Sequence, residues 1–102
     1  MAYVSDGLKL RTGGLSGAGN MNEWLLDTTD AIATVNTSNY ISDGVTRGML
    51  QGDLVYVRTR TSTLTGAVTA IHICFVLDVA TGSDAKGVDL TDGLAITATD
   101  TD

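Results

Sequence analysis

The sequence AVTAIHICFVLDV, residues 67–79, is the longest strand-like stretch of this chain and decides the fold class. Valine, isoleucine, threonine and phenylalanine suit a pleated, half-buried strand. Successive side chains of a strand point to opposite faces, so every second residue shares a face. The odd-numbered positions form a continuous apolar row, and we expect this row to be core: Ile71, Ile73, Phe75 and Leu77. If this row is core, Phe75→Ala lowers the free energy of unfolding by roughly 3–5 kcal/mol.

Shorter strand patterns lie on both sides of this stretch. Residues 54–60 alternate clearly, and we expect Val55 and Val57 to join the same core from an adjacent strand. Further strands are predicted at 22–27, 88–90 and 94–99, and one short helix at 31–35. Short strands bounded by Gly, Asp and Ser turns favour an all-β, mainly antiparallel fold. We expect a small β-sandwich or barrel with one short helix, formed by residues 21–102 as a single β domain.

The first 20 residues differ from the rest in composition. They hold five of the 12 glycines, and the stretch 13–19 shows neither helical nor strand periodicity. Glycine loses the most backbone freedom on ordering, so residues 1–20 are predicted to be a flexible, extended N-terminal arm. Its glycines resemble a phosphate-binding loop only superficially, because no Lys-Ser/Thr pair follows them. The side chains that could contact a partner are Leu8, Lys9, Leu10, Arg11 and Leu15.

Composition and charge limit the partners. The net charge of −6 repels phosphate, so nucleic acid is not expected as a partner. No stretch has the length and apolarity of a membrane span or a signal peptide, so we expect no membrane partner and synthesis in a cytoplasm. One Cys excludes an intrachain disulfide. A hydrophobic fraction of 43% is high for a 102-residue chain, which favours self-association.

The residues that could support chemistry are few. His72 and Cys74 are two apart on one strand and therefore roughly 6.5–7 Å apart along one face, too far for a direct nucleophile–base hydrogen bond. Either His72 and Cys74 are ordinary sheet residues, or they bind a metal or take part in catalysis. The C-terminal acids lack EF-hand spacing, and Trp24, Tyr40 and Tyr56 could form a sugar-stacking platform or lie in the core. We expect no enzyme activity, no metal and no cofactor.

The order of motifs carries a resemblance. A Gly-rich lead is followed by WLLDTTDAIATV at 24–35, NYI at 39–41 and GDLV at 52–55, and the chain closes with VDLTD at 88–92 and ITATDTD at 96–102. This layout resembles the head decoration, or capsid cement, proteins of tailed bacteriophages. Ile41 departs from the aromatic residue expected after the tyrosine, and the polar stretch 59–65 is also unlike the family.

The resemblance implies a virion structural protein without catalytic function. It would form a homotrimer on the outer capsid surface, bind the major capsid protein at capsomer junctions and stabilise the shell. Lys9 and Arg11 would then contact acidic capsid surface, while Leu8, Leu10 and Leu15 add apolar contact. The alternative is a trimeric tail-fibre or receptor-binding β module that binds host-surface glycans, which an exposed aromatic groove would favour.

Overall fold

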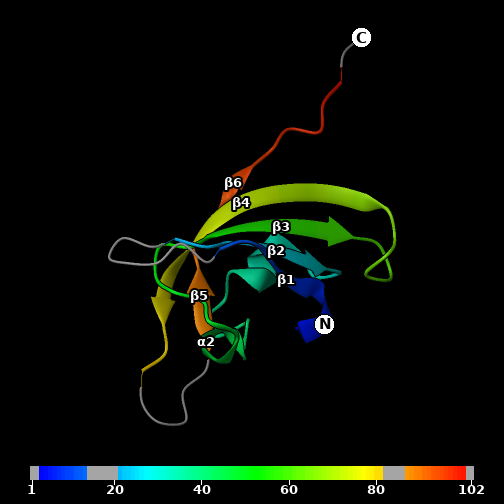
Figure 1. Ribbon diagram of the computed structural model, residues 1–102. Helices are drawn as coiled ribbons and strands as arrows, with labels where there is room; N and C mark the ends of the chain where they lie inside the picture. The colour runs from blue at the N-terminus through cyan, green and yellow to red at the C-terminus, as the bar shows by residue number, and fades with distance from the viewer. Residues whose placement is uncertain (1–2, 14–20, 82–86, 101–102) are drawn as a thin grey trace.

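The computed structural model describes residues 3–13, 21–81 and 87–100. Within these ranges the chain is mostly β-sheet, with two short α-helices and one 3-10 turn (Figure 1). The elements in chain order are η1 (Ser5–Gly7), β1 (Leu8–Thr12), β2 (Glu23–Thr28), α1 (Ile32–Val35), α2 (Gly44–Arg47), β3 (Leu54–Arg60), β4 (Val68–Val79), β5 (Val88–Leu90) and β6 (Leu94–Ala95).

The strands form one mixed sheet in the order β1-β2-β3-β4-β5, and β6 also pairs with β4. The β2–β3 pair is parallel, whereas the other pairs are antiparallel. Parallel neighbours need a crossover connection, and here the crossover carries α1 and α2. The all-β prediction is confirmed at this level, but the sheet is not a closed barrel, and two short helices stand where one was expected.

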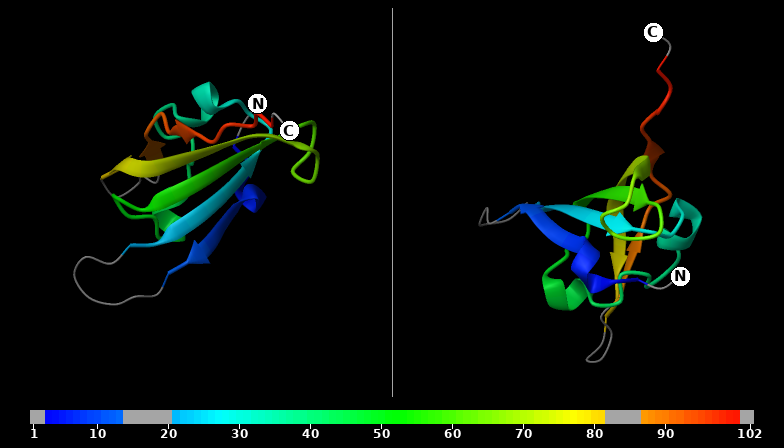
Figure 2. Two further views of the ribbon diagram at one scale, coloured as in Figure 1. Left: turned by 90° about the horizontal axis from the view of Figure 1, so that it is seen from above. Right: turned by 90° about the vertical axis from the view of Figure 1, so that its right-hand side faces the viewer.

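The core lies on one side of this sheet. Trp24, Val55 and Cys74 are cross-strand neighbours on β2, β3 and β4, and all three are buried. The crossover packs against them through Val35, Ile41 and Met49. Figure 1 shows β5 and α2 below the sheet, while the C-terminal segment rises on the opposite side, and Figure 2 gives two further views.

The prediction of the core was half wrong. Val55 and Val57 are fully buried, as expected, but Phe75 and Leu77 are 44% and 47% exposed, and Ile71 and Ile73 are only half-buried. The even-numbered residues of β4 face the core instead, and Cys74 and Val76 are buried there. Both rows of β4 are apolar near its middle, so alternation alone could not decide which row the crossover covers.

The predicted arm is also partly wrong. Residues 8–12 form β1, which pairs antiparallel with β2. Leu8 is buried in the core beside Leu26 and is not available to a partner. Lys9, Leu10 and Arg11 remain exposed on this edge strand, and Leu15 lies outside the described residues.

Candidate functional site

The side of the sheet opposite the core carries an apolar surface that no other described element covers. We call it the open face and define it by Leu25, Leu54, Tyr56, Ile71, Ile73, Phe75 and Leu94. Its central row runs across four strands, because Leu25 pairs with Tyr56, Tyr56 with Ile73 and Ile73 with Leu94. Leu94 is 71% exposed. An apolar surface spread over several strands is typical of an interaction site.

An ion cluster borders the open face at the far end of β3. The Asp27 carboxylate accepts two hydrogen bonds from Arg58, at 2.8 and 2.9 Å, and one from Arg60 Nε at 2.9 Å. Burial of Asp27 favours its neutral form, but the two guanidinium groups outweigh burial and lower the pKa of this carboxyl. Two positive charges on one negative charge leave a net positive patch on an otherwise acidic protein.

β1 forms one edge of the sheet. Lys9 lies on the open-face side because it pairs with Leu25. Arg11 donates to Glu23 at 2.8 Å and lies 5.7 Å from the centre of the Tyr56 ring. Among the residues that the structure describes, β1 is the terminal strand of the sheet and pairs only with β2. Its outer backbone edge and exposed side chains therefore form a second place where a partner strand could pair.

Beneath the sheet, Asp53 is a structural centre that sequence reasoning missed. The residue is 1% exposed, and its carboxylate accepts hydrogen bonds from Trp24 Nε1 at 3.0 Å and from the backbone N–H groups of Asn22 and Leu50 at 3.1 and 3.0 Å. The carboxylate joins the start of β2, the start of β3 and the preceding turn. Only tertiary contact reveals this role.

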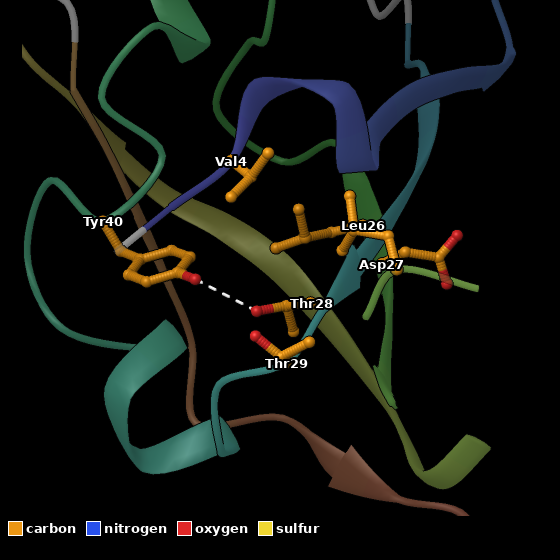
Figure 3. A pocket seen from close by; sticks show the side chains of 7 residues that line it. Val4, Leu26, Asp27, Thr28, Thr29 and Tyr40 are labelled. Carbon is orange, nitrogen blue, oxygen red and sulfur yellow. Dashed lines mark hydrogen bonds between the residues drawn. The ribbon is translucent and has the colours of Figure 1, made fainter. Parts of the chain in front are cut away.

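A second polar cluster ties Tyr40 to the end of β2. Tyr40 Oη donates to Asp30 Oδ2 at 2.5 Å. It also lies 3.1 Å from Thr28 Oγ1 (Figure 3). This Oγ1 accepts a hydrogen bond from the Asp30 backbone N–H. Burial and the neighbouring Asp30 carboxylate raise the pKa of Tyr40 to about 12, so the phenol stays protonated. The cavity beside it, lined by Val4 and Leu26 among others, is about 10 Å³. This is room for about one water molecule, not a substrate.

His72 and Cys74 lie on the core side of β4. Cys74 is buried, and burial followed by the charge of Asp92 raises its thiol pKa to about 11. A thiol with this pKa is a poor nucleophile near neutral pH. His72 Nδ1 is buried without a hydrogen-bond partner among the described residues. Within the same residues, no three His, Cys, Asp or Glu side chains come together as a metal site.

Aromatic residues are divided between the two sides of the sheet. Trp24 is buried and hydrogen-bonded to Asp53, and Tyr40 is held by Asp30, so neither is free to stack on a ligand. Tyr56 and Phe75 lie on the open face, so of the three aromatic residues considered for sugar stacking only Tyr56 lies on that face.

Comparisons with protein-family models, curated proteins and solved structures found no match for this chain. In the described part of the chain, no helix is long and apolar enough to cross a membrane.

Proposed function

We propose that this chain is a virion structural protein, a capsid decoration or cement protein that binds the outside of a phage head at capsomer junctions. The resemblance in sequence suggests the role, and the observation that carries it is the outer edge of β1, which has no partner strand among the described residues. A well-packed core with an uncovered apolar sheet face suits a protein that acts by attachment. The role needs no turnover, and the raised pKa of the Cys74 thiol is compatible with that.

The capsid contact proposed here is the outer edge of β1. The backbone carbonyl of Asn22, the residue before β2, accepts a hydrogen bond from the backbone N–H of Leu54 on β3. The backbone N–H and C=O groups of the even-numbered residues of β2 therefore point to β3, and those of the odd-numbered residues point to β1. Lys9 pairs with Leu25, so the backbone of Lys9 points inward and that of Leu10 points outward. A capsid strand could pair with this edge, and Lys9 would bring positive charge to an acidic surface.

The β1 edge replaces the flexible arm as the proposed contact. Exposed ion pairs contribute only about 0–1 kcal/mol each, so backbone pairing and the 54% exposed Leu10 side chain supply most of the affinity. A glycan-binding tail-fibre role is disfavoured because Trp24, the largest stacking residue, is buried.

The test adds purified full-length protein to heads that lack it and measures binding by cosedimentation. Leu10→Pro removes the outward N–H, while Leu10→Ala keeps it and loses only the side chain. We expect Leu10→Pro to bind at least about tenfold more weakly than Leu10→Ala, a difference of about 1.4 kcal/mol. Lys9→Ala with Arg11→Ala should weaken binding only modestly.

Each variant is first checked for folding by circular dichroism, because edge strands tolerate proline but Leu8 beside the site is buried. Equal decoration by Leu10→Pro and Leu10→Ala would refute the edge-strand contact. Failure of the unaltered protein to bind heads would refute the cement role itself.

A further inference from the structure

The open face carries most of the positive charge of this acidic chain. Four of the six basic residues have their side chains on this side of the sheet, around its apolar centre: Lys9, Arg11, Arg58 and Arg60. Of the twelve acidic residues, β1, β2 and β3 place only Glu23 and Asp27 on the same side. These three strands therefore give the open face a net charge of +2, whereas the whole chain carries −6. The C-terminal segment, which carries Asp100, leaves the sheet and points away from it (Figure 1).

The two arginines of the ion cluster can still bind another anion. Arg58 donates to Asp27 through Nε and Nη2. Arg60 donates to Asp27 through Nε and to the Gly66 carbonyl through Nη1. A guanidinium group has five N–H donors, so Arg58 Nη1 and Arg60 Nη2 keep donors that bond to no described residue. A carboxylate approaching this end of the open face could accept hydrogen bonds from them, and charged partners make such bonds strong.

We propose that the open face docks against a protein surface that is apolar at its centre and carries carboxylates at its rim, and that on the phage head this surface belongs to the major capsid protein. An apolar centre inside a polar rim, with arginine enriched, is the usual composition of a protein interface. The inference rests on the proposed function and adds a second contact to the β1 edge. The two contacts are continuous, because Lys9 lies on the edge strand and its side chain is on the open-face side.

Charge disfavours a second copy that meets this face with its own open face. Such a pair would set a net charge of +2 against another +2, and like charges facing each other across an interface are costly. A bilayer is disfavoured by shape, because membrane-surface binding buries an apolar face about 5–10 Å deep. The central side chains of the open face, Leu25, Tyr56 and Ile73, are half-buried in the sheet surface.

The experiment changes the charge at Leu94, which ends the central row of the open face and is 71% exposed. Leu94→Glu and Leu94→Lys lose the same apolar side chain and differ by two charges. Each full-length variant is checked for folding by circular dichroism and added to heads that lack the protein. Binding is measured by cosedimentation at about 0.1 M and about 1 M salt, between which the screening length falls from about 10 Å to about 3 Å. The matched control pair is Ala33→Glu and Ala33→Lys, at an exposed position of α1 in the crossover.

We expect Leu94→Glu to bind heads at least about tenfold more weakly than Leu94→Lys at the lower salt concentration, because a charge pair at a protein surface contributes about 1 kcal/mol or more. The difference should shrink at the higher salt concentration, and the Ala33 pair should differ by less than about twofold at both. Equal binding by the two Leu94 variants, or tighter binding by Leu94→Glu, would overturn the inference while the cement role stands. Failure of the unaltered protein to bind heads would refute the cement role, and the inference with it.

Two further measurements test the other occupants of the open face. The unaltered protein is mixed with vesicles of phosphatidylcholine and phosphatidylglycerol in equal amounts, and we expect no cosedimentation. Sedimentation of the free protein should give the same number of copies for the unaltered chain and for Leu94→Glu. Binding to the vesicles would assign the face to a membrane, and dissociation of an oligomer by Leu94→Glu would assign it to a second copy; either result would overturn the inference.

Discussion

Asp53→Ala tests whether the buried carboxylate beneath the sheet holds the domain together. The substitution removes the acceptor of three hydrogen bonds, from Trp24 Nε1 and from the backbone N–H groups of Asn22 and Leu50. The indole N–H is buried and would lose its partner, whereas the N–H of exposed Leu50 can turn to water.

The expected loss follows from these contacts. An unsatisfied buried donor costs about 1–3 kcal/mol, and hydrogen bonds to a charged group contribute about 1.5–3 kcal/mol each. Because two of the donors lie nearer the surface, we expect Asp53→Ala to lower the free energy of unfolding by about 4 kcal/mol. This is a large part of the 5–15 kcal/mol typical of a small domain. Asp53→Asn keeps one acceptor oxygen and should cost about half as much.

The assay is urea unfolding followed by circular dichroism and by fluorescence of Trp24, the only tryptophan. The matched control is Asp78→Ala on β4, whose exposed side chain should change stability by less than about 0.5 kcal/mol. The assigned role of this carboxylate is refuted if Asp53→Ala lowers the free energy of unfolding by less than about 1 kcal/mol and the slope of that free energy against urea concentration is unchanged.

Three further predictions follow from the same structure. Phe75→Ala should lower the free energy of unfolding, measured in urea, by less than about 1 kcal/mol. Val57→Ala should lower it by about 2–3 kcal/mol, because the substitution loses buried apolar area and leaves a cavity. The reverse order would contradict the assignment of the core side. Asp27 has a lowered pKa in the folded protein, so its contribution to stability is present above its ordinary pKa of 3.8 and is lost as the pH falls below that value. Asp27→Asn should flatten this acid-side fall in melting temperature, and an unaltered pH profile would count against the ion cluster. The double change His72→Gln with Cys74→Ala should leave head binding intact in any folded protein, and loss of binding by a folded variant would assign these residues a functional role.

Much of the strand pattern was predictable from local sequence. The bounds of β3 and β5 were predicted to the residue, and those of β4 nearly so, because β-branched runs there are bounded by Gly, Asp and Ser turns. β1 was missed although Leu8-Lys9-Leu10-Arg11 alternates apolar and basic residues, because this alternation is short and borders a run of glycines. The parallel pairing of β2 with β3 also left no local trace, since it depends on how the crossover returns to the sheet.

The candidate site was harder to predict, for a related reason. The row Ile71, Ile73, Phe75 and Leu77 was recognised as one apolar face, but it was assigned to the core, although the structure leaves that face open. A strand with apolar residues on both sides gives two equivalent patterns, and only the packing of α1, α2 and β5 selects the covered one. The contacts of Leu8 and Asp53 are likewise long-range in sequence and could not be seen from composition.

The central claim, that the protein decorates phage heads, is tested most directly by quantitative mass spectrometry of virions separated into heads and tails. The account predicts that this chain is found with the heads, in a fixed ratio to the major capsid protein. It also predicts that heads stripped of it burst at lower temperature than decorated heads. Finding the chain only with tails, or in neither fraction, would contradict the proposed function.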